Sequence, residues 1–273
     1  MVGLDLPVVM GVLNVTPDSF SDGGRYLDPG AAVAAARRMA AEGAAFIDVG
    51  GESTRPGAVP LDAAEELKRV VPVVRALAGE LDVVISVDTS RAAVIEAAVA
   101  AGASFVNDVR GLRDPEALAA AARTGVGVCV MHMQGEPATM QDAPAYGDVV
   151  GEVRAWLAAR VAACQAAGIA ADAIAVDPGF GFGKTAEHNL ALLGALEEFT
   201  TLGAPLLIGL SRKALIGRLT GRPAGERLAG SVALAAIAAS RGAAIARAHD
   251  VAATVDAVRV GAALRRPAAR GRH

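Results

Sequence analysis

Polar side chains recur along the chain at the carboxyl ends of eight short apolar segments. These residues are Asn14; Glu52, Ser53, Thr54 and Arg55; Asp88; Asn107 and Asp108; His132; Asp177; Ser211, Arg212 and Lys213; and Arg247, His249 and Asp250. One such residue alone is typically a helix cap or a solvated loop group. Eight groups at equivalent positions predict one shared polar site, built from carboxylates, amides and cations.

Cations follow the last two apolar segments. Lys213, Arg247 and His249 offer charged hydrogen-bond donors of the kind that bind phosphate strongly. The chain has only three lysines among 26 basic residues, and an ammonium differs from a guanidinium in size, hydration and tunable pKa. These residues therefore favour a phosphorylated substrate.

Oxygen ligands occur in the connection after the first segment, at Asn14, Asp18 and Asp22. Magnesium takes few protein oxygens and completes its shell with water and substrate phosphate. These three oxygens are therefore candidate ligands for a Mg²⁺ ion. Asp18 and Asp22 stand in the sequences TPDS and SDGG, so a turn role is equally open for both.

Acceptors end three of the middle segments, at Asp88, Asn107 and Asp177. Buried carboxylates are costly unless hydrogen-bond donors satisfy them. A flat heterocycle with a guanidine-like edge would supply such donors, because a carboxylate accepts two parallel N–H groups. The acceptors therefore favour a heterocyclic ligand.

Several other functional classes are excluded. The segment DPGFGFGKT has Pro178 where a phosphate-binding P-loop requires glycine, and neither HExxH nor GxSxG occurs. Cys129 and Cys164 lack zinc-ligand spacing and are expected to be buried thiols. The net charge of -3 argues against nucleic-acid binding, and the apolar runs are too short for a membrane span. Without a secretory signal, the expected location is the cytoplasm.

The elements that position these residues alternate in type. Candidate strands cover 8–13, 46–49, 83–87, 104–107, 126–131, 173–176, 205–210 and 243–246, with Ala-rich helical stretches between them. Eight such units in 273 residues predict a single-domain α/β protein, a (β/α)₈ TIM barrel. A doubly wound open sheet is the alternative fold. We expect the barrel to cover 8–260 and residues 265–273 to form a flexible tail.

Local signals refine this expectation. Asp62-x-x-Glu65 is typical of a helix start, and Asp114 followed by Pro115 indicates another. The long connections Asn14–Pro29 and Gly50–Leu61 are rich in glycine and are predicted to be mobile loops.

The order and spacing of eight segments resemble one enzyme family. The segments are MGVLNVTPDSFSDGGRY, DVGGESTRPGA, SVDTSR, VNDVRGLRD, MHMQG, DPGFGFGKTAEHNL, GLSRKALIG and RAHDV. They are similar to the bacterial dihydropteroate synthases. The resemblance covers residues 8 to about 260. It implies a cytoplasmic, Mg²⁺-dependent homodimeric transferase of folate biosynthesis, inhibited by sulfonamides. Such enzymes join 6-hydroxymethyl-7,8-dihydropterin diphosphate to p-aminobenzoate and release diphosphate.

The resemblance also implies roles for single residues. Asn14 would bind the metal, and the catalytic group would be Asp88, Lys213, Arg247 and His249. The pterin and its diphosphate would contact Thr54, Asp88, Asn107, Asp177, Lys213, Arg247 and His249. The p-aminobenzoate pocket would contain Thr54, Arg55, Pro56, Phe182 and Lys213. The resemblance suggests that diphosphate leaves first and that Asp88 stabilises the pterin methyl cation.

The chain departs from the family pattern at two positions. Ala214 replaces a serine found in some members, and Ala248 replaces a more usual valine. Three other functions stay open at this point: a pterin-binding methyltransferase-type barrel, an aldolase using Lys213 as a nucleophile, and a non-catalytic pterin-binding paralogue.

Overall fold

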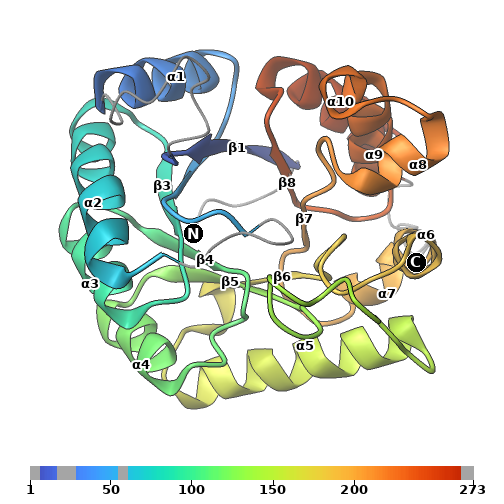
Figure 1. Ribbon diagram of the computed structural model, residues 1–273, viewed down its shortest axis with the longest axis horizontal. Coiled ribbons are helices and arrows are strands. Elements are labelled where there is room, and N and C mark those ends of the chain that lie inside the picture. Colours follow the sequence, from blue (N-terminus) through green and yellow to red (C-terminus); the bar gives the residue numbers. More distant parts are fainter. Residues whose placement is uncertain (1–6, 17–28, 55–60, 266–273) are drawn as a thin grey trace, which may run out of the picture.

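The computed structural model describes residues 7–16, 29–54 and 61–265 of the chain. Eight parallel strands form one sheet in the order β6-β5-β4-β3-β2-β1-β8-β7, and helices surround it (Figure 1). A backbone bridge between Val176 and Leu206 places β6 beside β7, so the sheet curves into a nearly closed barrel. The predicted (β/α)₈ fold is confirmed.

The eight strands agree closely with the predicted segments. They are β1 (Val8–Asn14), β2 (Phe46–Gly50), β3 (Val84–Asp88), β4 (Phe105–Asp108), β5 (Gly127–Met131), β6 (Ile174–Asp177), β7 (Leu207–Ile208) and β8 (Ile245–Ala248). Strand β7 is shorter than predicted because Pro205 lacks an N–H for the ladder and Gly209 weakens a strand. Strand β8 starts two residues late, since alanine has little strand preference.

Helices connect and cover the strands. They are α1 (Pro29–Ala41), α2 (Ala63–Glu80), α3 (Ala92–Ala100), α4 (Pro115–Thr124), α5 (Val149–Ala166), α6 (Ala186–Gly194), α7 (Leu196–Thr200), α8 (Ala214–Thr220), α9 (Leu228–Ser240) and α10 (Val251–Ala263), with 3₁₀ turns at Ala171–Ala173 and Ala224–Glu226. Both predicted helix starts are confirmed: Asp62 accepts from the N–H of Glu65, and Asp114 accepts from the N–H of Glu116.

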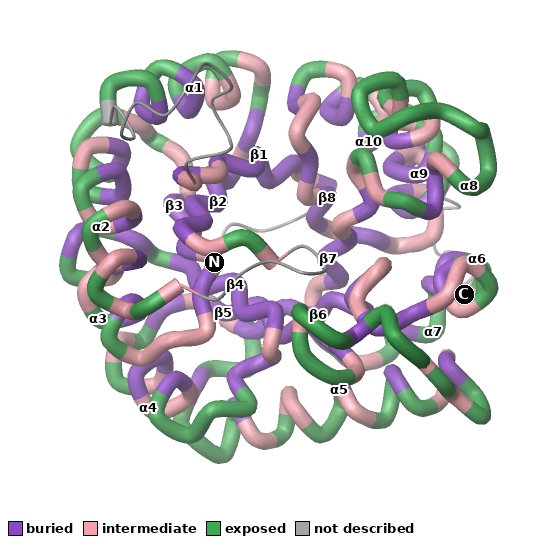
Figure 2. The backbone as a smooth tube through the Cα atoms, in the orientation of Figure 1, coloured by how far each residue is buried: buried purple, intermediate pink, exposed green. Residues whose placement is uncertain are grey.

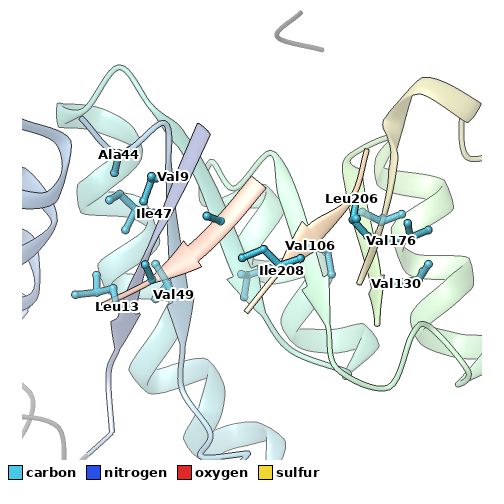
Figure 3. Close-up of a cluster of buried hydrophobic side chains, with 14 of the residues drawn as sticks. Val9, Leu13, Ala44, Ile47, Val49, Val106, Val130, Val176, Leu206 and Ile208 are labelled. Atoms are coloured by element: carbon cyan, nitrogen blue, oxygen red, sulfur yellow. The ribbon is translucent and has the colours of Figure 1, made fainter. Parts of the chain in front are cut away.

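The main core lies between the strands and the helices. Alternate strand residues point outward, and Figure 3 shows Ile47, Val49 and Val106 among them. The strands are accordingly buried along most of their length, while the outer helix faces are exposed (Figure 2). This packing holds each strand end in place for the site.

A second, smaller cluster fills the amino-terminal end of the barrel interior. It consists of Met10, Phe46, Phe105, Cys129, Ala175, Leu207 and Ile245. Two residues further along β2, β3, β4 and β8, the next inward-facing positions are polar. They are Asp48, Ser86, Asn107 and Arg247. The barrel interior therefore changes from apolar at one end to polar at the other.

Some predictions fall outside the described residues. These are the roles of Asp18, Asp22, Arg55 and Pro56, the mobility of the two long loops, and the tail after Arg265. Among the helices of the described ranges, none combines the length and apolar content that crossing a bilayer requires.

Candidate active site

Arg247 links two carboxylates at the polar end of the barrel interior. Its Nε donates to Asp48 Oδ2 at 2.6 Å, and its Nη2 donates to Asp88 Oδ2 at 2.8 Å. Burial alone lowers the pKa of this guanidinium, yet the charges of Asp48 and Asp88 raise it overall. Arg247 is therefore a permanent cation between two carboxylates.

Asp48 joins the inner strands through further bonds. Its Oδ1 accepts from Ser86 Oγ at 2.5 Å, and its Oδ2 accepts from Asn107 Nδ2 at 3.0 Å. Both the Asp48 and Ser86 side chains are fully buried. Because the Asn107 amide nitrogen is directed to Asp48, its carbonyl oxygen is the atom available to a ligand.

Asp88 has an unusual protonation equilibrium. Burial raises the pKa of its carboxyl to about 7; the Arg247 charge lowers it, whereas the nearby charges of Asp48 and Asp108 raise it. Asp88 also lines a cavity of about 250 Å³ together with Thr54, Ser90 and Val109. This carboxyl, which lines the cavity, can therefore change its charge near neutral pH.

Asp177 and Lys213 form a second part of the site. Asp177 ends β6, and its Oδ1 accepts from the N–H of Gly179 at 2.7 Å. Lys213 precedes α8; its Nζ donates to the Phe180 carbonyl and lies 4.3 Å from the centre of the Phe182 ring. Burial lowers the pKa of Lys213 to about 8, against the opposing charge of Asp177.

His249 lies between the end of β8 and the start of α10. Its backbone N–H donates to Ser211 Oγ at 3.2 Å, and its Nδ1 lies 3.1 Å from the same oxygen. Arg212 fixes the adjacent turn through two bonds to Asp250, at 2.9 and 2.5 Å. The first N–H groups of α10 follow directly, which is favourable for an anion.

Asn14 ends β1 on the same side of the barrel. It pairs in register with Gly50 of β2, and Gly50 pairs with Asp88 of β3. The structure thus gathers carboxylates, amides and cations from β1, β2, β3, β4, β6 and β8 and from the start of α8 at one end of the barrel, which is where TIM-barrel enzymes carry their active sites.

Comparison with known proteins identifies this arrangement. The family model described as "Pterin binding enzyme" matches residues 10–249. The dihydropteroate synthase of Escherichia coli (strain K12) is 54% identical over 259 residues, covering 94% of this chain and 92% of the relative. The chain belongs to the dihydropteroate synthase family.

Solved structures of dihydropteroate synthases agree with this fold. The Yersinia pestis enzyme, solved as a complex with a sulfonamide drug, is 52% identical with a TM-score of 0.91, covering 95% of this chain and 94% of that chain. The Xanthomonas albilineans enzyme in complex with 7,8-dihydropteroate is 49% identical with a TM-score of 0.87, covering 95% and 94%. The chain is thus a transferase of folate biosynthesis.

Most candidate residues of this dihydropteroate synthase site come together in the structure. Asp88, Asn107 and Arg247 share the network around Asp48, and Asp177 lies with Lys213 and Phe182. Thr54 lines the Asp88 cavity, whereas His249 lies at the Ser211 turn. Arg55 and Pro56 are outside the described residues.

The sequence interpretation missed Asp48, Ser86, Arg91 and Lys184. Asp48 and Ser86 stand inside strands rather than at their ends, and a polar residue at alternate positions of FIDVG and VISVD is the signal that could have found them.

Arg91 organises a partly buried ionic cluster beside the Asp88 cavity. Its guanidinium donates to Glu52, to Glu66 and to the Leu61 carbonyl, and Glu52 Oε1 accepts from the Leu61 N–H at 3.2 Å. Burial raises the pKa of Glu66 despite the Arg91 charge. Arg91 therefore links the end of β2 to the start of the α2 segment, on the two sides of residues 55–60.

Proposed function

We propose that this chain condenses 6-hydroxymethyl-7,8-dihydropterin diphosphate with p-aminobenzoate to give 7,8-dihydropteroate and diphosphate. The observation that carries the proposal is the Asp48–Arg247–Asp88 network with Asp177 and Lys213 beside it. Its acceptors suit a pterin and its cations suit a diphosphate. The X. albilineans relative solved with 7,8-dihydropteroate supports this assignment.

The pterin ring would lie between Asp177 and Asn107. Asp177 uses one oxygen for the Gly179 N–H, so its second oxygen can accept from the N–H edge of the pterin. Asn107 offers its carbonyl oxygen, because its amide nitrogen is committed to Asp48. Lys213 would donate to the ring carbonyl. Charged partners make such bonds stronger than neutral ones.

The diphosphate would lie near Arg247 and His249, at the start of α10. Two donor nitrogens of Arg247 are held by Asp48 and Asp88, which fixes the orientation of the guanidinium. Negative charge develops there as the diphosphate leaves, and fixed cations and helix N–H groups stabilise it. Asp88, when ionised, would stabilise the pterin methyl cation on the other side of the breaking bond. The neutral arylamine then attacks this cation with its nitrogen lone pair, which forms the C–N bond, and the nitrogen releases one proton to solvent.

A Mg²⁺ ion fits the donor set near Asn14. Within the described residues no group of three or more His, Cys, Asp or Glu side chains is arranged to hold a metal. Magnesium needs only one or two protein oxygens when phosphates and water supply the rest. Asn14 would hold the ion, which supplies positive charge to the leaving diphosphate. Asp18 and Asp22 are further candidate contacts.

The p-aminobenzoate would bind beside the pterin, between Thr54, Phe182 and Lys213, with Arg55 and Pro56 contributing from residues 55–60. Ala214 provides no hydroxyl for its carboxylate, but Ala214 is the first residue of α8 and its N–H can serve instead. A sulfonamide would compete for the same position, as the Y. pestis complex suggests.

A homodimer would use the face formed by α8, α9 and α10. Five of the six large hydrophobic side chains exposed in the described ranges belong to these helices and their ends: Leu219, Leu228, Ile237, Val260 and Leu264. Exposed apolar groups that gather on adjacent helices indicate an interface. Sedimentation of the protein and of Val260→Asp tests this, since a monomer in both cases would contradict it. The buried thiols Cys129 and Cys164 suit the reducing cytoplasm.

The decisive experiment is product formation by purified protein. We expect 7,8-dihydropteroate when both substrates and Mg²⁺ are present, and none when either substrate is omitted. Pterin binding without product would contradict the proposal and favour a binding paralogue or a methyltransferase-type barrel. Borohydride trapping of a carbonyl substrate on Lys213 would favour an aldolase.

A further inference from the structure

The connection between β6 and α6 encloses a buried lysine. Lys184 is only 3% exposed, and its Nζ lies 3.0 Å from the carbonyl oxygens of Gly179 and Phe182. It also lies 3.3 Å from the His132 carbonyl oxygen and 2.9 Å from His132 Nδ1. All four acceptors are uncharged, so no direct ion pair accounts for this buried ammonium.

The backbone around Lys184 is tightly constrained. Gly179 and Gly183 have φ of +71° and +60°, which favour glycine. A Cβ on Gly179 would lie 1.9 Å from the His132 carbonyl oxygen, and one on Gly183 would lie 2.5 Å from that of Gln134. The connection therefore packs directly against the segment after β5. Lys184 holds the two together from inside.

The opposite side of the same connection supports Lys213. The Phe180 carbonyl accepts from Lys213 Nζ, and the Phe182 ring lies beneath that ammonium. The carbonyls of Gly179 and Phe182 point inward to Lys184, whereas that of Phe180 points to Lys213. Because the carbonyls alternate in direction, the Phe180 carbonyl and the Phe182 ring face the site.

We propose that Lys184 is a positioning residue for the p-aminobenzoate half of the site. By binding the carbonyls of Gly179 and Phe182, it fixes the Phe182 ring and the Phe180 carbonyl against which Lys213 is placed. This inference rests on the proposed function, which assigns Phe182 to p-aminobenzoate and gives Lys213 contacts to both substrates.

Packing alone does not account for a lysine at this position. Burial lowers the pKa of the Lys184 ammonium to about 7, even with the opposing charge of Asp177, so an unbranched apolar side chain would fill the space without this electrostatic penalty. The ammonium adds N–H donors that bind the carbonyl oxygens of His132, Gly179 and Phe182 together.

The pterin half of the site is held by other contacts. Asn107 is bonded to Asp48, and Asp177 is fixed by strand pairing with Met131. Within the connection between β6 and α6, the Gly179 N–H donates to Asp177 Oδ1. Asp177 and Asn107 thus have contacts that do not involve Lys184, whereas Phe182, which belongs to the p-aminobenzoate half alone, depends on it. Loss of Lys184 should therefore raise the KM for p-aminobenzoate more than the KM for the pterin diphosphate.

The test compares Lys184→Met with Lys68→Met in the full-length protein. Lys68 is an exposed lysine on α2, so it controls for the same chemical change at the surface. We expect Lys184→Met to raise the KM for p-aminobenzoate about tenfold, and to change the KM for the pterin diphosphate by less than about threefold. Lys68→Met should match the unmodified protein in both values.

Two results would overturn the inference. One is an unchanged KM for p-aminobenzoate in a folded Lys184→Met protein. The other is an equal rise in both KM values, which indicates general loosening. If Lys184→Met does not fold, Lys184→Gln offers a shorter polar side chain with only two N–H donors for the carbonyls of Gly179, Phe182 and His132. It should raise the KM for p-aminobenzoate about threefold, and no rise would overturn the inference.

A readout without turnover separates this inference from the proposed function. A crystal structure of Lys184→Met should show the Phe182 ring displaced from Lys213, and an unchanged ring would contradict the positioning role. Failure of the unmodified protein to form dihydropteroate would contradict the proposed function instead.

Discussion

The bonds around Asp48 allow a quantitative test of the site. Asp48→Asn keeps the shape of the side chain but removes its charge and places an amide N–H₂ where one carboxylate oxygen was. Asp48 accepts from Ser86, Asn107 and Arg247. The amide can therefore satisfy only part of these donors, and one N–H must face another donor.

The cost follows from burial and from the second partner of Arg247. Breaking a buried ion pair typically costs about 3–5 kcal/mol, because a charge is left uncompensated. Arg247 retains its 2.8 Å bond to Asp88, so the guanidinium keeps one counter-charge. We therefore expect the free energy of unfolding to fall by about 3 kcal/mol, the lower end of that range.

Equilibrium urea unfolding measures this change, with the fluorescence of the single tryptophan, Trp156, and circular dichroism as probes. Asp82→Asn at the surface is the matched control and should change the free energy of unfolding by less than about 0.5 kcal/mol. Arg247→Met, alone and with Asp48→Asn, completes a double-mutant cycle. A coupling below about 0.5 kcal/mol, or a loss for Asp48→Asn below about 1 kcal/mol, would refute the proposed network.

Three further results are expected. Burial raises the pKa of Asp88 to about 7, and only the ionised form stabilises a cation, so kcat/KM for the pterin diphosphate should rise with pH through about 7. Asp88→Asn should lose this rise. A pH profile identical to that of the unmodified protein would exclude Asp88 as the group that stabilises the cation. Asn14→Ala should lower kcat/KM about 10 to 100-fold while binding of a pterin without diphosphate stays nearly intact; equal losses would exclude a metal role. In calorimetric titrations, p-aminobenzoate should bind more tightly with pterin, diphosphate and Mg²⁺ present, by about 1–3 kcal/mol; equal affinity would indicate a preformed pocket.

The sequence was sufficient to predict the barrel because its signals are local. Apolar runs such as VVISV and helix starts such as Asp62 depend on neighbouring residues. Strand β7 was predicted too long, since a run of apolar residues does not show where hydrogen bonding to the next strand stops.

The site was predictable in composition but not in its connections. Asp88, Asn107 and Asp177 could be found because they end strands. Asp48 could not be found by that rule, and its bond to Arg247 joins residues 199 positions apart in the chain. Lys184 was excluded as part of a P-loop, but only the fold shows that its ammonium turns inward to carbonyl groups.

The short β7 strand has a consequence for how the barrel wall opens. β7 pairs with β8 at two positions, and on its other side the Val176 N–H donates to the Pro205 carbonyl. β1 and β2, by comparison, pair at five positions. Local opening is easiest where few cross-strand bonds must break. Amide hydrogen exchange should therefore be fastest along the junction between β6 and β7. Asp177 ends β6 and Lys213 follows β7. A pterin bound to both residues would bridge this junction and slow the exchange.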